Sequence, residues 1–140
     1  MMKRTLWMLL ASLLLLAACG NQPAPAAIAP AGAAVTNITV QDLKTQLGGK
    51  EHIFLLDVRS AEEYTNDGHV AGSTLIPLPD LARRASELPT DRPIVCICRS
   101  GNRSTTACNQ LANQGFTQLR NVQGGMIAWG QAGYPIAYGQ

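Results

Sequence analysis

The chain has 140 residues, of which 46% are hydrophobic and 14% are charged, as is ordinary for one soluble domain with an added apolar segment. A second domain of usual size does not fit in this length. The 11 basic and 9 acidic residues give a formal charge of +2, and they are not clustered as contacts with a phosphate backbone require. The composition therefore argues against nucleic acid as a partner.

Residues 1–18 have the pattern of a secretory signal peptide. Lys3 and Arg4 precede a run from Leu6 to Leu16 that is almost wholly apolar. A transmembrane helix is the alternative, but it needs roughly 20 apolar residues and this run is shorter. Cleavage after residue 18 would remove two of the 11 basic residues and none of the 9 acidic ones, so the formal charge would fall to zero.

The end of this run resembles the lipobox of bacterial lipoproteins. In that motif, which Leu16-Ala17-Ala18-Cys19 matches, the cysteine is acylated and becomes the first mature residue. A buried or disulfide-bonded Cys19 is the alternative, but the residues after it offer little apolar surface. The resemblance implies a lipid such as palmitate on Cys19 and a membrane anchor in the bacterial cell envelope. Gly20 in place of aspartate favours the periplasmic face of the outer membrane, whereas a Gram-positive source would place the domain outside its single membrane.

Residues 19–35 are predicted to form a tether between this anchor and the folded domain. After Cys19 they are mostly alanine, proline, glycine, asparagine and glutamine, with Ile28 as the only large apolar residue before Val35. Such a segment cannot offset its ordering entropy by burial. The folded domain is therefore expected over residues 36–140.

Within residues 36–140, strand patterns alternate with helix patterns. Ile53-Phe54-Leu55-Leu56 and Ile94-Val95-Cys96-Ile97 are short apolar runs typical of strands buried on both faces. Ser60 and Glu63 have the spacing of a capping box, which predicts a helix start. In chain order we expect helix 39–47, strand 53–56, a helix from Ser60, strand 74–78, helix 80–88, strand 94–97, helix 104–114 and strand 118–121.

This alternation predicts an α/β fold with a mainly parallel central sheet and helices on both faces. In such sheets ligands bind beyond the carboxyl ends of the strands. Cys98 stands at such an end, just after the strand predicted over residues 94–97 and a few residues before the next helix. It is therefore the first candidate for a functional residue.

The environment predicted for Cys98 favours its ionised form. A tight turn between a strand end and a helix start directs successive backbone N–H groups inward, where they and the helix dipole attract an anion. This stabilises a thiolate, which lowers the cysteine pKa and provides the nucleophilic form. Arg99 and Arg103 add positive charge, and Gly101 permits a positive φ. A structural loop with a buried cysteine and two solvated arginines is the alternative.

The segment Cys98-Arg99-Ser100-Gly101-Asn102-Arg103-Ser104 resembles the active-site loop of single-domain rhodaneses. Further segments resemble the same family in the same order, and together they span nearly all of residues 36–140. They are Asp57-Val58-Arg59, Glu62-Glu63-Tyr64, Gly68-His69-Val70-Ala71-Gly72-Ser73, Ile76-Pro77-Leu78, Gly124-Gly125-Met126, Trp129 and Gly133-Tyr134-Pro135. The resemblance implies a rhodanese-like domain.

The resemblance also implies an activity, that of a rhodanese-type sulfurtransferase. Cys98 would take sulfane sulfur from a small anionic donor such as thiosulfate, carry it as a persulfide, and pass it to a thiol or cyanide acceptor. No cofactor, metal or general base is expected, because the attacking thiolate is already ionised. The residues that the resemblance assigns to substrate binding are Arg99, Ser100, Gly101, Asn102 and Arg103.

Two other functions are compatible with a cysteine loop. Phosphatases and arsenate reductases have a related loop with five residues between Cys and Arg, whereas Cys98 and Arg103 enclose four. A rhodanese-like module that binds a partner or senses oxidants without catalysis is the second alternative. Such modules often lack the cysteine that this chain keeps.

The remaining candidates are given structural roles. Cys96 and Cys108 do not have the spacing of zinc ligands, and both are expected to pack in the core. The alternative is a thiol that forms a disulfide with oxidised Cys98, and Cys108 would then be the partner of Cys98. Asp57 and Arg59 are expected to form a structural pair, with attraction of anions by Arg59 as the alternative. His52 and His69 receive no catalytic role, and Trp129 is expected to be a core anchor.

Overall fold

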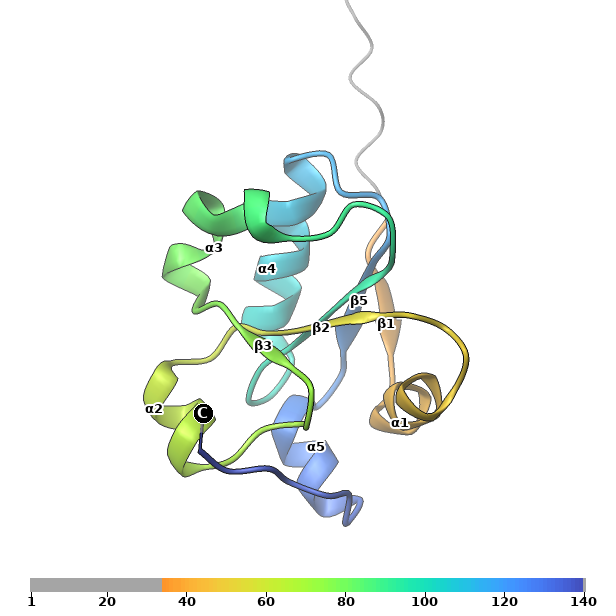
Figure 1. Cartoon of the computed structure of the whole chain (residues 1–140), viewed down its shortest axis with the longest axis vertical. Coiled ribbons are helices and arrows are strands. Elements are labelled where there is room, and N and C mark those ends of the chain that lie inside the picture. Colours follow the sequence, from red (N-terminus) through yellow and green to blue (C-terminus); the bar gives the residue numbers. More distant parts are fainter. Residues whose placement is uncertain (1–33, 140) are drawn as a thin grey trace, which may run out of the picture.

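The computed structural model describes residues 34–139. The predicted signal peptide, the lipidated Cys19 and most of the tether lie outside the described residues. The elements in chain order (Figure 1) are β1 (Thr36–Ile38), α1 (Val40–Gly48), β2 (Phe54–Asp57), α2 (Ala61–Asn66), β3 (Thr74–Leu75), α3 (Leu78–Arg84), the 3-10 helix η1 (Ala85–Glu87), β4 (Ile94–Ile97), α4 (Asn102–Asn113), β5 (Leu119–Val122) and α5 (Gly125–Gln131).

The strands form one five-stranded sheet in the order β1-β5-β4-β2-β3, and every pairing is parallel. Helices α3 and α4 lie on one side and α1 and α5 on the other (Figure 1). The sheet therefore has two cores, the first under α3 and α4 and the second under α1 and α5. Along β4, Ile94 and Cys96 point into the first core and Val95 and Ile97 into the second, because successive side chains of a strand alternate between faces. The predicted α/β layers and parallel sheet are confirmed.

Two elements were missed in the sequence, and both are short. β1 has three residues, of which only Ile38 is buried, so it carries no apolar run. Helix α5 begins at Gly125, contains Gly130 and has no side-chain cap, a composition typical of turns. Tertiary contacts hold it in place, since Met126 and Trp129 fill the second core.

Two predicted boundaries were displaced by prolines. Strand 74–78 ends at Leu75, and the helix expected over residues 80–88 begins at Leu78 and gives way to η1 at Ala85. Pro79 lies in the first turn of α3, where a missing N–H and a fixed φ are tolerated. The Pro77-Leu78-Pro79 corner is therefore a helix start.

The starts of α2 and α1 follow the capping rules. The Ser60 side chain accepts from the Glu63 N–H at the start of α2 while the Glu63 carboxylate accepts from the Ser60 N–H, which confirms the predicted capping box. Thr39 and Asp42 form a second one at α1. Over residues 34–139 the helices are too short or too polar to cross a bilayer, and no group of three or more potential metal ligands gathers there.

Candidate active site

Cys98 lies directly after β4, the central strand of the sheet, at its carboxyl end. Gly101, the residue before α4, has φ of +100°, a conformation that residues with a side chain rarely adopt. A Cβ at this position would also lie 3.3 Å from the Gly124 nitrogen and the Val122 oxygen. Glycine therefore lets the chain turn from strand to helix within three residues of the cysteine.

The turn places hydrogen-bond donors around the sulfur. The Gly101 N–H lies 3.1 Å and the Ser104 hydroxyl 3.4 Å from Cys98 Sγ. Burial by itself raises the pKa of the Cys98 thiol, but the Ser104 hydroxyl and the backbone N–H groups of Ser104, Ser100 and Gly101 outweigh burial and hold this pKa below its usual value. The predicted anion cradle is present, and it favours the thiolate.

The Cys98 side chain is also buried. The relative exposure of Cys98 is 0%, and its side chain belongs to the core under α3 and α4. Ser104, which holds the sulfur from α4, is equally buried. The sulfur therefore lies within the fold, at the base of the loop.

Helix α5 supports the loop from beneath. The Met126 N–H donates to the Cys98 carbonyl at 2.9 Å, and the Ile127 N–H donates to the Arg99 carbonyl at 3.0 Å. A Cβ at Gly125 would lie 2.2 Å from the Cys98 carbonyl oxygen. Sequence reasoning assigned no role to Gly125, although the Gly124-Gly125 pair was the signal that marked a close backbone approach.

The two arginines of the loop differ. Arg99 is exposed and forms no ion pair with the described residues. Arg103 is paired with Glu63 of α2 through two short hydrogen bonds of 2.6 and 2.7 Å. The Arg103 hydrogen bonds and burial act in opposite directions on Glu63, and the net effect lowers its pKa to about 2. Glu63 was predicted only as a helix cap, so its bond to Arg103 was missed.

The predicted pair of Asp57 and Arg59 forms beside the loop. The Arg59 side chain is 2% exposed, that of Asp57 is 0% exposed, and the two groups approach to 2.7 Å. The guanidinium also donates to the Gly68 carbonyl at 2.8 Å. These contacts use Arg59 inside the fold, which favours the structural role over attraction of anions.

The other two loop residues, Ser100 and Asn102, are exposed and line a polar hollow with Asn37, Asn121 and Gln123 on the β1 and β5 side of the loop. On the β2 and β3 side lies a second hollow whose walls are mostly apolar. Its lining includes Val58, Pro77, Leu78, Pro79 and Arg103. The cysteine loop therefore stands between a polar and an apolar recess.

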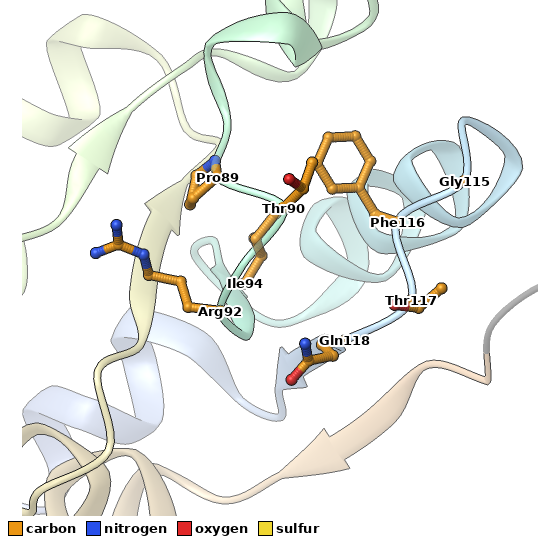
Figure 2. Close-up of a pocket in the computed structure, with 8 residues that line it drawn as sticks. All are labelled: Pro89, Thr90, Arg92, Ile94, Gly115, Phe116, Thr117 and Gln118. Carbon is orange, nitrogen blue, oxygen red and sulfur yellow. The ribbon is translucent and has the colours of Figure 1, made fainter.

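A further hollow lies at the opposite end of β4 (Figure 2). There the segment before the strand, with Pro89 and Arg92, faces the turn after α4, with Phe116 and Gln118. None of its lining residues is a cysteine, histidine, aspartate or glutamate. The cysteine loop, with its hydrogen-bonded thiol, therefore remains the stronger candidate for the active site.

The other described cysteines, Cys96 and Cys108, are both buried, as predicted for core residues, and neither is in a disulfide. A hydrogen bond with the Cys108 thiol, with burial, raises the pKa of Cys96 well above its usual value. Cys108, the partner of Cys98 only in the alternative interpretation, therefore lies against Cys96, and Ser104 takes the place beside Cys98. The reason is geometric. Cys96 and Cys98 are two residues apart in extended chain, and Ser104 and Cys108 are about one helical turn apart on α4, so the two spacings are similar and each cysteine faces a different residue of the helix.

The fold and the site define an α/β domain in which a strand-to-helix loop holds a cysteine whose pKa is lowered by hydrogen-bond donors. The sequence pattern described as Rhodanese-like domain matches residues 39–132, and the chain belongs to that family. A Sulfurtransferase of Allochromatium vinosum is 37% identical over 102 residues, which cover 73% of this chain and 94% of that protein. The Thiosulfate sulfurtransferase GlpE of Pseudoalteromonas translucida is 32% identical over 84 residues, which cover 60% of this chain and 79% of that protein.

Solved structures agree with this assignment. A rhodanese-related protein from Thermoplasma volcanium matches with a TM-score of 0.65 at 32% identity, and the match covers 72% of this chain and 96% of that one. A rhodanese-like domain protein from Staphylococcus aureus matches with a TM-score of 0.66 at 29% identity, covering 73% and 98%. The rhodanese-like fold is confirmed, and sulfur transfer is the general activity that the named relatives support.

Proposed function

We propose that the chain moves sulfane sulfur from thiosulfate to a thiol or to cyanide through a persulfide on Cys98. The observation that supports this best is the cradle itself, in which N–H and O–H donors surround the sulfur and hold the pKa of Cys98 below its usual value. A thiolate prepared in this way needs no general base.

The reaction divides into two displacements. In the first, the Cys98 thiolate attacks the outer sulfur of thiosulfate, a new S–S bond forms, and the old S–S bond breaks with its electron pair leaving on sulfite. In the second, cyanide or a thiolate attacks the outer sulfur of the persulfide, and the Cys98 thiolate is the leaving group. The donors around Cys98 Sγ stabilise the negative charge that this sulfur brings to the first step and regains in the second.

Arg99 is the cation that we assign to the donor. It is exposed and without an ion pair among the described residues, so a dianionic donor can approach it without displacing a carboxylate. Arg103 contributes less, because both of its terminal nitrogens already donate to the Glu63 carboxylate. Ser100, Gly101 and Asn102 contribute the backbone of the cradle.

Intact-mass spectrometry of the purified full chain, before and after incubation with thiosulfate, tests this proposal. We expect the mass of one added sulfur atom, its loss on addition of cyanide, and stoichiometric thiocyanate. A Cys98→Ser variant is expected to give neither the adduct nor thiocyanate, while Cys108→Ala is expected to give both, because Cys108 contacts Cys96 rather than the reacting sulfur.

The opposite results separate the alternatives. If Cys98 is demonstrably reduced and gains no sulfur from thiosulfate, the thiosulfate proposal fails and a binding or redox-sensing module takes its place. If the chain instead releases phosphate from an aryl phosphate in a Cys98-dependent manner, the phosphatase alternative holds. Loss of the adduct in Cys108→Ala would assign that thiol a part in the transfer.

We further propose that the domain is attached to the cell envelope through a lipid on Cys19, at the periplasmic face of the outer membrane. The support is the lipobox resemblance of Leu16-Ala17-Ala18-Cys19 after a signal-like run. Expression of the full chain with Cys19→Ala in a bacterium with two membranes is expected to abolish processing and move the protein out of the outer-membrane fraction. Unchanged processing and fractionation would contradict the anchor.

A further inference from the structure

The Ser104 hydroxyl has three acceptors within reach and one hydrogen to give. Its Oγ lies 3.4 Å from Cys98 Sγ, 3.0 Å from the Gly101 carbonyl and 2.6 Å from Asn121 Oδ1. A hydroxyl donates one hydrogen bond at a time and accepts with its lone pairs. When the hydrogen points to Asn121, which is at the shortest distance, the lone pairs of Oγ are what Ser104 presents to the sulfur.

Asn121 connects this hydroxyl to the surface. Its side chain is buried at 4% relative exposure, on β5, and its amide nitrogen donates to Asn37 Oδ1 at 2.9 Å. Asn37 lies opposite it in register on β1 and is exposed. The chain Asn37, Asn121, Ser104, Cys98 is therefore a continuous hydrogen-bond path from the polar hollow to the reacting sulfur.

Such a path has two directions. The oxygen and the nitrogen of a side-chain amide occupy equivalent positions, so the same heavy atoms accommodate either orientation of Asn37 and Asn121. In one direction Ser104 donates to Asn121, and Asn121 donates to Asn37. In the other, Asn37 donates to Asn121, Asn121 donates to Ser104 Oγ, and the Ser104 hydrogen is released for donation to the sulfur or to the Gly101 carbonyl.

We propose that Asn37 and Asn121 are positioning residues that determine whether the Ser104 hydroxyl donates to the sulfur on Cys98 or away from it. Donation toward the sulfur stabilises the thiolate, and donation away leaves an oxygen that accepts from the S–H of the thiol. Neither amide touches the sulfur, so both act through Ser104. The proposal concerns the resting thiolate, and it stands whether or not thiosulfate is the donor.

The charged and titratable groups around Cys98 come from residues outside the path of Asn37, Asn121 and Ser104. Helix α5 packs under the loop without a charged residue, and β5 reaches the sulfur only through the bond between Asn121 and Ser104. The groups that face the sulfur or lie next to those that do are Arg103 from α4, Glu63 from α2, Asp57 and Arg59 from the end of β2, Cys96 from β4 and Arg99 in the loop. None of them is a member of the path.

Two substitutions at Asn37 lock the path in opposite directions. Asn37→Asp leaves only acceptors, so Asn121 must turn its nitrogen outward and Ser104 must donate to Asn121 instead of the sulfur. Asn37→Lys leaves only donors and has the reverse effect. Gln123→Glu and Gln123→Lys are the matched controls. Gln123 is exposed in the same hollow but is not a member of the path, and these substitutions change the charge there by the same amounts.

The readout is the ultraviolet absorbance of the thiolate from about pH 5 to 9, taken for the full chain as a difference from the Cys98→Ser form of each variant. The rate of alkylation at neutral pH accompanies it. We expect Asn37→Asp to lower, and Asn37→Lys to raise, the alkylation rate about threefold to tenfold, which lies within the net strength of one ordinary hydrogen bond. The Gln123 variants are expected to change it less than about twofold, because exposed charges are screened.

Combination with Asn121→Leu completes the test. This substitution interrupts the path, so the Asn37 effects should shrink to those of the matched Gln123 variants. The proposal is overturned if Asn37 and Gln123 variants of equal charge behave alike in the parent, or if the Asn37 effects persist with Leu at position 121. Neither measurement needs a sulfur donor, so failure here is distinct from failure of the thiosulfate proposal.

Discussion

Neighbouring strands β2 and β4 end side by side, and each end buries an acidic group, a carboxyl at β2 and a thiol at β4. Asp57 closes β2, where it pairs in register with Ile97, the last residue of β4, and Cys98 follows directly after Ile97. Both residues have a relative exposure of 0%. The two sites therefore share a position in the fold, and they differ in what compensates the charge.

Asp57 is compensated by a full charge and Cys98 by dipoles. The Arg59 guanidinium donates to both oxygens of Asp57 at 2.7 to 3.0 Å, so the carboxylate is fully occupied. The sulfur of Cys98 instead meets a backbone N–H and a hydroxyl, which stabilise a thiolate without binding it to a cation. A fixed counter-ion makes the first site structural, and neutral donors leave the second free to attack an electrophile.

The largest effect is expected from Arg59→Met, which breaks the compensation at β2. Removal of one partner of a buried pair leaves an unpaired charge, so the free energy of unfolding should fall by about 3–5 kcal/mol. Urea denaturation of the full chain, followed by circular dichroism, measures this change.

The double variant Asp57→Asn with Arg59→Met is the control for that experiment. With no buried charge left, we expect it to regain a large part of the lost stability. Equal stability of the parent and Arg59→Met would show that the ion pair does not compensate a costly charge, and the contrast between the two strand ends would be lost.

A smaller effect is expected from Gly125→Ala, which disturbs the β4 end. Its Cβ would lie 2.2 Å from the Cys98 carbonyl oxygen, and the residue has φ of +52°. Overpacking of this kind costs about 1–3 kcal/mol, and here it also displaces the loop. We expect a loss of persulfide formation larger than the loss of stability explains.

Gly133→Ala separates the two causes. Gly133 also has a positive φ, of +70°, but a Cβ there meets nothing within 4 Å. It should therefore lose only the stability due to backbone strain, about 1 kcal/mol, and keep its activity. If both variants lose activity alike, the close approach of α5 to the loop is not what positions Cys98.

The sequence alone predicted most of the fold because local patterns and layer rules agree for the long elements. The apolar runs at 53–56 and 94–97, the capping box at Ser60 and the helix after the cysteine all needed only neighbouring residues. β1 and α5 failed the same test, because their stability comes from pairing with β5 and from packing under the loop. Tertiary contacts of this kind leave no local pattern.

The site divides in the same way. Cys98, Gly101 and the turn that holds them are consecutive in the chain, so the cradle could be predicted. The bond of Glu63 to Arg103 joins residues 40 positions apart, and that of Asn121 to Asn37 joins residues 84 apart. The capping role of Glu63 was visible, and its second role was not.

The smallest stability effect is expected from Glu63→Gln, because Glu63 links the helices that follow the two strand ends. Glutamine keeps the capping-box acceptor for Ser60 and removes the charge that holds Arg103. The side chains of the pair are 23% and 39% exposed, so solvent screening limits the loss at neutral pH to about 1 kcal/mol or less. The freed Arg103 should lower the KM for thiosulfate about twofold to fivefold, and an unchanged KM would place Arg103 outside the donor site.

The pH dependence of this difference has a defined sign. Folding lowers the pKa of Glu63 from 4.5 to about 2, first through its hydrogen bonds from Arg103, so the unfolded chain takes up the proton at a higher pH than the folded one. The stability that the parent has over Glu63→Gln is therefore complete above pH 4.5, and it is lost as the pH falls from 4.5 through about 2. Urea midpoints of the two proteins across this range should converge toward acid. A gap that stays constant with pH would mean that the charge of Glu63 contributes nothing to holding the two strand ends together.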